Sequence, residues 1–115
     1  MHSRPRFLQG AFPFTGAGLD SPGGLDGGLS YKVPADRRAQ LVYFRGGNST
    51  DELIYVRLLR DGEPMRLFPL GARAGTHVAL RVVEDLLPGT EIEIDVAAPA
   101  GTSGTAIIDV GLVES

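Results

Sequence analysis

The sequence predicts an all-β fold: a single-domain antiparallel β-sandwich, jelly-roll-like, with about seven to eight strands. Three observations lead to this prediction. The chain has 115 residues, enough for one domain with its own apolar core. From Leu29 onward, short apolar runs are separated by turn residues every 8 to 14 positions, as in sandwiches and barrels. No internal repeat with a period of about 20 to 50 residues is found, which argues against solenoids and propellers.

The first three strands of the predicted sandwich are residues 29–33, 39–45 and 52–60. Residues 29–33 alternate with period two and stop at Pro34, which has no amide hydrogen for a ladder. Residues 39–45 are apolar on both faces, which favours a central strand. The third strand ends at Asp61-Gly62, a dipeptide typical of tight hairpins.

The remaining predicted strands are residues 63–70, 76–83, 91–96 and 105–113. Pro64 and Pro69 place the first of these at a sheet edge or a bend, because proline cannot donate to a neighbour. Residues 79–87 fit either a strand or a short helix, and both alternatives stay open. Residues 91–96 alternate three acids with three β-branched residues, so one face must be buried.

Residues 1–28 form a predicted extended N-terminal arm, and residues 29–115 form the predicted sandwich. The first 30 residues hold seven Gly and three Pro, a composition that opposes helix formation. Three of the five phenylalanines, Phe7, Phe12 and Phe14, also lie here. We expect the arm to lie across the domain or a neighbouring subunit, with these phenylalanines as anchors. Its deletion should then leave the sandwich folded.

Composition excludes several classes of function. The absence of cysteine excludes thiolate metal sites and thiol catalysis, and two histidines cannot supply a multi-histidine centre, so we expect no metal and no cofactor. A net charge of -3 argues against a nucleic-acid partner. Uncharged stretches of at most 13 residues argue against a membrane span. The N-terminal apolar run is broken by Gly and Pro, unlike a secretory signal, so we expect a cytoplasmic protein.

No pattern in the sequence favours an enzyme. His77 is the one histidine of residues 29–115, and a structural role suits its place at the start of a strand. The closest carboxylate pairs fall at loop edges, where solvated turn residues are usual. Asn48 follows two glycines and is interpreted as a turn residue with positive φ.

The uneven distribution of charge gives one candidate interaction surface. All 11 basic residues, ten of them Arg, lie in residues 1–81, whereas residues 82–115 hold seven acids and no base. Arginine is enriched at protein interfaces, where its planar fork binds carboxylates. The acids of residues 91–96 can therefore face arginines within the sandwich or across a subunit boundary. The residues concerned are Arg57, Arg66, Arg81, Glu91, Glu93 and Asp95.

A second candidate surface is a ligand platform formed by Tyr43 and Tyr55, with Arg45 and Arg57 beside them. It exists if both tyrosines face outward on neighbouring strands, whose register the sequence leaves open. The loops of residues 46–51 and 99–104 are further places for a ligand.

These observations predict a non-catalytic protein-interaction or assembly module. Its partner would be a second copy of the chain or a larger subunit, bound through the arm and the charged faces. The alternative is a ligand-binding β-sandwich for a carbohydrate or another small polar molecule, which would use the tyrosine platform or the loops.

Overall fold

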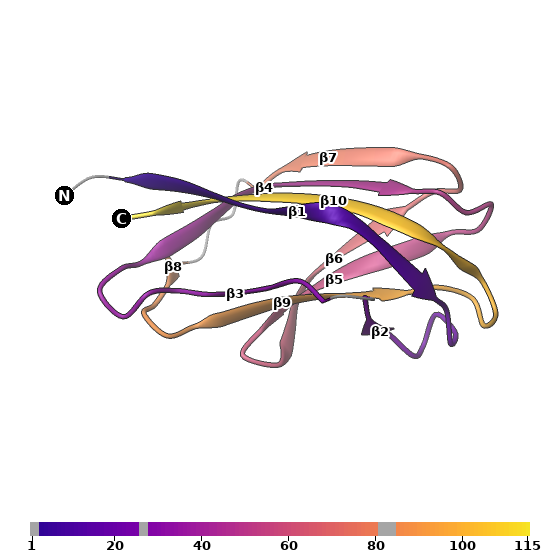
Figure 1. Cartoon of the computed structure of the whole chain (residues 1–115), viewed down its shortest axis with the longest axis horizontal. Helices are drawn as coiled ribbons and strands as arrows, with labels where there is room; N and C mark the ends of the chain where they lie inside the picture. The colour runs from indigo at the N-terminus through magenta and orange to yellow at the C-terminus, as the bar shows by residue number, and fades with distance from the viewer. Residues whose placement is uncertain (1–2, 26–27, 81–84) are drawn as a thin grey trace.

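The computed structural model describes residues 3–25, 28–80 and 85–115, which form ten antiparallel strands in two facing sheets (Figure 1). The first sheet, sheet A, has the order β1 (Arg4–Thr15), β10 (Ser103–Glu114), β4 (Ala39–Asn48) and β7 (Gly75–Ala79), with β8 (Asp85–Leu86) also pairing β4. The second, sheet B, has the order β2 (Gly23–Gly24), β9 (Glu91–Ala97), β5 (Ile54–Arg60) and β6 (Glu63–Leu70), with β3 (Ser30–Lys32) also pairing β9. The predicted all-β sandwich is therefore confirmed, and the described part contains no helix.

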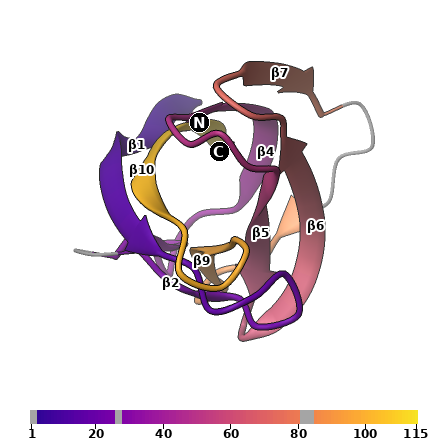
Figure 2. The ribbon, with the colours of Figure 1, turned by 90° about the vertical axis from the view of Figure 1, so that its right-hand side faces the viewer.

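The core fills the space between the two sheets, seen along the long axis in Figure 2. Alternate residues of each strand point inward, so β9 buries Ile92, Ile94 and Val96 as the sequence predicts. Phe44 of sheet A stacks on Phe68 of sheet B, with ring centroids 4.0 Å apart. The molecule is elongated, 47 Å long and 23 Å across. β1 begins and β10 ends at the same end of the long axis, where Arg4 pairs with Glu114 (Figure 1).

Residues 4–15 form a strand of the sandwich, not an arm outside it. β1 pairs with β10 along its whole length, from Arg4 opposite Glu114 to Thr15 opposite Ser103. Its inward residues include Leu8 and Phe14, both buried in the core. The expectation that the first 28 residues contribute no strand to the core is therefore wrong. Glycine and proline are tolerated because β1 lies at a sheet edge, where one side of the strand needs no partner.

The seven strands predicted in residues 29–115 all occur, with shifted ends. The Asp61-Gly62 turn joins β5 to β6 with positive φ at both residues, and β6 is an edge strand, as its prolines indicate. β4 is central, but only one of its faces is buried, since Val42 is 44% exposed. Of residues 79–87, Asp85–Leu86 pair with β4 as a strand, and residues 81–84 lie outside the described residues.

No helix that could cross a membrane occurs in the residues that the structure describes.

Candidate ligand-binding groove

Four polar side chains form one row across the outer face of sheet A. The register places Gln9 of β1 opposite Asp109 of β10, Asp109 opposite Arg45 of β4, and Arg45 opposite His77 of β7. Residues at equivalent positions of paired strands point to the same side of a sheet. The inward row beside it, Ile108 with Gly10 and Gly46, faces the core. The polar row therefore faces solvent.

An open groove of about 700 Å³ lies over this row. Its floor has little side-chain bulk because Gly47 of β4 pairs with Gly75 of β7. Ile107, which is 59% exposed, gives the groove an apolar wall. A second hollow of about 280 Å³ shares these three residues and continues along the strands toward Arg73 and Thr105. The outer face thus offers a long depression with polar and apolar surfaces.

Tyr43 fixes the polar row at one side of the groove. Its ring occupies the space that a Cβ atom would need at Gly111, and its hydroxyl donates to Asp109 Oδ1 at 2.9 Å. Partial burial, followed by the hydrogen bond to Asp109, raises the pKa of Tyr43, so the hydroxyl stays a donor at neutral pH. The His77 ring meets the tyrosine edge-on, with centroids 5.9 Å apart. Tyr43 therefore positions two members of the row, Asp109 through its hydroxyl and His77 through its ring.

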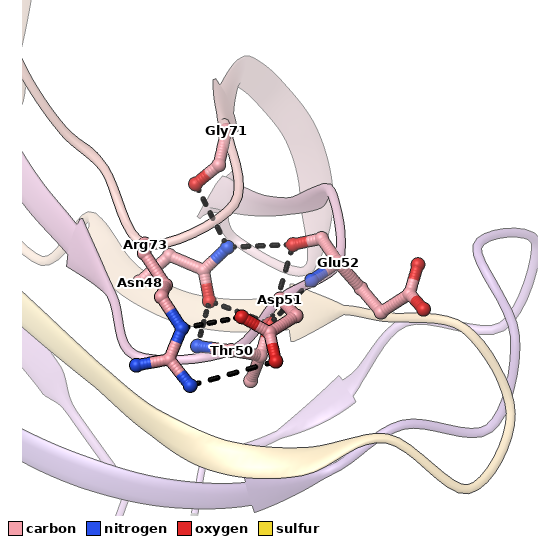
Figure 3. Close-up of polar contacts among 6 residues, drawn as sticks. All are labelled: Asn48, Thr50, Asp51, Glu52, Gly71 and Arg73. Atoms are coloured by element: carbon pink, nitrogen blue, oxygen red, sulfur yellow. Dashed lines mark hydrogen bonds and ion pairs between the residues drawn. The ribbon is translucent and has the colours of Figure 1, made fainter.

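Asn48 lies at the end of β4 and lines the second hollow, and Figure 3 shows its polar contacts. This buried side chain donates through Nδ2 to the carbonyl oxygens of Glu52, Leu70 and Gly71 at 2.7, 3.3 and 3.0 Å. Its Oδ1 accepts from the amide and the hydroxyl of Thr50 at 2.9 and 2.8 Å. Asn48 therefore ties the end of β4 in sheet A to the segment before β5 and to the end of β6 in sheet B. Its φ is not positive, so the interpretation of Asn48 as a left-handed turn residue is wrong.

The rim beyond Asn48 carries an exposed ion pair between Arg73 and Asp51 (Figure 3). The Arg73 amide also donates to the Thr50 carbonyl at 2.8 Å, which joins the two loops. The guanidinium lowers the pKa of Asp51, first through their hydrogen bond and then through charge attraction. Of the predicted loop of residues 46–51, residues 46–48 belong to β4, and residues 46–49 line the two hollows.

The three phenylalanines predicted as partner anchors have three different environments. Phe14 is buried in the core of its own sandwich, and Phe12 packs against that core from a half-buried position. Phe7 is 56% exposed on the outer face of β1. Phe14 and Phe12 therefore hold β1 on its own domain.

The predicted charge pairing exists in part within the chain. Arg57 donates from Nε and Nη2 to the two carboxylate oxygens of Asp95 at 2.9 and 2.7 Å, across the β5–β9 ladder. Arg66 instead places its guanidinium over the Phe68 ring, 5.6 Å from the centroid. Glu91 and Glu93 are half-buried on β9, and Arg81 lies outside the described residues.

The two tyrosines do not form a common platform, so that prediction is wrong. Tyr43 lies in sheet A and Tyr55 in sheet B, and their strands are not paired. The Tyr55 hydroxyl donates to the carbonyl of Leu19 at 2.6 Å. Arg45 and His77, both named in the predictions from sequence, line the groove, and Tyr43 lies beside it in contact with His77 and Asp109. Gln9 and Asp109 were missed, because only the pairing of distant strands brings them into the row.

The described residues of the groove form no recognisable catalytic arrangement. Within the described residues His77 hydrogen-bonds to no carboxylate, and no group of three or more His, Cys, Asp or Glu side chains is placed to hold a metal ion. Its polar groups offer amide, carboxylate, guanidinium and imidazole donors and acceptors, which suit a ligand rich in hydroxyl groups.

Comparison with solved structures identifies similar folds. No protein-family model and no curated protein sequence matches the chain. The chain is similar to the CBM36-1 domain of a multidomain xylanase from the hindgut metagenome of Trinervitermes trinervoides, with a TM-score of 0.60, 18% identity and 96% of each chain covered. A structure of infectious bursal disease virus, Gt strain, gives a TM-score of 0.51 at 12% identity, covering 97% of this chain and 32% of that chain. A family 35 carbohydrate binding module from Clostridium thermocellum gives a TM-score of 0.48 at 18% identity, covering 95% and 97%. The two matches with TM-scores above 0.5 show that the chain shares its overall fold with these structures.

Proposed function

We propose that this protein is a non-catalytic carbohydrate-binding module that binds a polysaccharide chain in the groove of sheet A. The observation that carries the proposal is the row of Gln9, Asp109, Arg45 and His77 inside an open groove. Side chains on adjacent strands are spaced by about 4.8 Å, which is the scale of one sugar residue. A row of this kind offers hydrogen-bonding groups to several hydroxyls at once.

The apolar surfaces of the groove support the same ligand class. Sugar rings have apolar faces beside their hydroxyls, and binding sites for them combine aromatic or aliphatic side chains with a few placed polar groups. Here Ile107 and the edge of His77 provide the apolar part. Tyr43 holds Asp109 in place, so less conformational freedom is lost when a ligand binds.

The fold comparison also supports a binding module. The similar domain from the termite hindgut metagenome is named as a carbohydrate-binding module, and the likeness extends over nearly the full length of both chains. Fold alone does not assign a ligand, so the proposal depends on the groove.

The assembly module that the sequence favours loses its main support. That hypothesis needed an arm free to reach a neighbour, whereas β1 uses its inward side chains in its own core. It also relied on the uneven distribution of basic and acidic residues along the chain. Arg57 and Asp95, two of the residues concerned, form an ion pair within the chain instead. The ligand-binding alternative therefore becomes the leading proposal.

The test is affinity gel electrophoresis with a panel of soluble neutral and acidic polysaccharides in the gel. Wild-type protein should be retarded by at least one polymer. Gly47→Val fills the floor of the groove and leaves the polar row in place, so it should abolish retardation. A Cβ atom at position 47 would lie 3.6 Å from the Ile107 Cβ, which is an ordinary van der Waals contact, and it would meet no other atom of a non-adjacent residue within 4 Å. The substitution should therefore not disturb the strand.

Arg38→Ala is the matched control, because Arg38 is exposed before β4 and outside the groove lining. Retardation that Gly47→Val leaves intact would place the binding elsewhere. No retardation by any polymer would end the proposal.

A further inference from the structure

Arg45 is a cation in the groove without a partner in the described structure. Other arginines have one: Arg4 and Arg6 contact Glu114, Arg57 contacts Asp95, and Arg73 contacts Asp51. Arg45 is exposed, lines the groove, and makes no hydrogen bond or ion pair with any described residue. Its guanidinium is therefore available to a ligand.

The ion pairs around the groove leave Arg45 as the cation that an anion can reach. Two guanidinium groups, of Arg45 and Arg73, line the two joined hollows, but Arg73 is already paired with Asp51. Among the described lining residues, Asp109 is the one carboxylate, and one of its oxygens already accepts from Tyr43. Arg73 and Asp51 therefore balance each other, and Arg45 is the guanidinium of this depression that forms no ion pair with a described residue.

Guanidinium chemistry identifies the group that would be bound. Arginine presents a planar fork of N–H donors that binds a carboxylate or a sulfate through two parallel hydrogen bonds. A neutral hydroxyl uses only part of that fork. Arg45 stands at the centre of the row, one strand from His77 and one strand from Asp109, where a sugar in the groove would place its substituent.

We infer that the groove selects acidic polysaccharides and that Arg45 binds the anionic group of the sugar, which rests on the proposed carbohydrate-binding function. The neighbouring Asp109 and Gln9 then bind hydroxyls of the same chain. The two sources of the anionic group are the carboxylate of a uronic acid and the sulfate of a sulfated sugar.

The inference is tested by titrating the protein with two pairs of matched polymers. One pair is polygalacturonate and its fully methyl-esterified form, and the other is dextran sulfate and dextran. Isothermal titration calorimetry is run with wild type, Arg45→Ala, Arg45→Lys and Arg38→Ala, after thermal melting has shown that each variant is folded. Arg45 is exposed, so its replacement should not affect folding.

The wild type should bind at least one charged polymer about tenfold or more tightly than its uncharged counterpart, as expected for a charge-assisted pair of hydrogen bonds. Arg45→Ala should remove this preference, Arg45→Lys should restore part of it, and Arg38→Ala should leave it unchanged. Preference for polygalacturonate identifies a uronic acid, and preference for dextran sulfate identifies a sulfated sugar.

Three outcomes would overturn the inference. Equal affinity for the charged and uncharged polymers would contradict selectivity for acidic sugars. If binding were still lost in Gly47→Val, the carbohydrate-binding function itself would remain supported. An equal loss in Arg45→Ala and Arg38→Ala would indicate general charge attraction without a site. Failure to bind any polysaccharide would remove both proposals.

Discussion

Glu114 shows how one buried carboxylate joins the two sheets. Its side chain is fully buried, accepts from Arg4 Nη2 at 2.9 Å, lies 3.6 Å from Arg6 Nε, and accepts from the Tyr31 hydroxyl. The hydrogen bond from Tyr31, followed by the two arginines, holds the pKa of Glu114 below its ordinary value despite the opposing effect of burial. Burial, followed by Glu114, raises the pKa of Tyr31, so the hydroxyl remains a donor.

The pH dependence of stability follows from the lowered pKa of Glu114. A depressed carboxyl pKa stabilises the fold above the ordinary carboxyl range, and this stabilisation is lost as the pH falls through the folded-state value. Glu114→Gln should therefore lower the free energy of unfolding at neutral pH by about 1.5–3 kcal/mol, the contribution of hydrogen bonds to a charged group. Urea unfolding at neutral and acidic pH measures it. The difference from wild type should shrink in acid, and an unchanged difference would contradict this account.

Asn48 gives a second prediction, because its amide nitrogen lies among three carbonyl oxygens. Asn48→Asp keeps the shape and replaces that donor by an oxygen that repels all three. The free energy of unfolding should fall by about 3 kcal/mol or more, as when a buried group is left without its partner. Asp51→Asn, which breaks only the exposed pair with Arg73, should change the urea midpoint little. A similar effect of both substitutions would contradict the view that the hydrogen bonds of Asn48 stabilise the end of β4.

At the level of the strand, β1 is the element on which sequence and structure differ most. It has the period-two pattern of a half-buried strand, with Leu8, Phe12 and Phe14 inward and Phe7 and Gln9 outward. Gly10, Pro5 and Pro13 interrupt that pattern and favour an irregular segment when neighbours are ignored. The 12 pairs with β10 override this local preference, and they join the two ends of the chain, which no local pattern can indicate.

The strands that were predicted correctly carry a local signal. Asp61-Gly62 marks the β5–β6 turn, and the alternation of acids and β-branched residues marks β9. The groove carries no such signal, because Gln9, Asp109, Arg45 and His77 come from four strands. Tyr43 and Tyr55 were grouped for the same reason, since the sequence does not show that β4 and β5 belong to different sheets.

Removal of β1 tests its place in the core. Deletion of residues 1–16 removes Leu8 and Phe14, each worth about 1.5–3 kcal/mol when buried, from a domain with a typical stability of about 5–15 kcal/mol. It also removes the two arginines that contact Glu114. The truncated chain should lose its cooperative thermal transition in circular dichroism, and a peptide of residues 3–16 added in excess should restore it. Deletion of residues 1–3 is the control, and a sharp transition after the longer deletion would return the segment to the role of an arm.

On the scale of the whole molecule, one edge strand of each sheet is protected from pairing with other copies: β1 in sheet A and β6 in sheet B. β1 carries Pro5 and Pro13, and β6 carries Pro64 and Pro69. Proline at an edge removes donors that a second strand would need, which is a common protection against edge-to-edge association. The charges on β9 are partly satisfied within the chain by the Arg57–Asp95 pair.

These features predict a monomer whose mass does not depend on salt. Light scattering after size exclusion should give 12.2 kDa at both low and high ionic strength, because β1 is paired within its own sheet and Arg57 and Asp95 are paired within the chain. An oligomer that dissociates as salt screens its charges would contradict this prediction and restore assembly through charged faces. Repeating the measurement with a bound oligosaccharide separates the two functions, because a binding module should gain only the mass of the sugar, whereas an assembly module should keep its oligomeric mass with or without it.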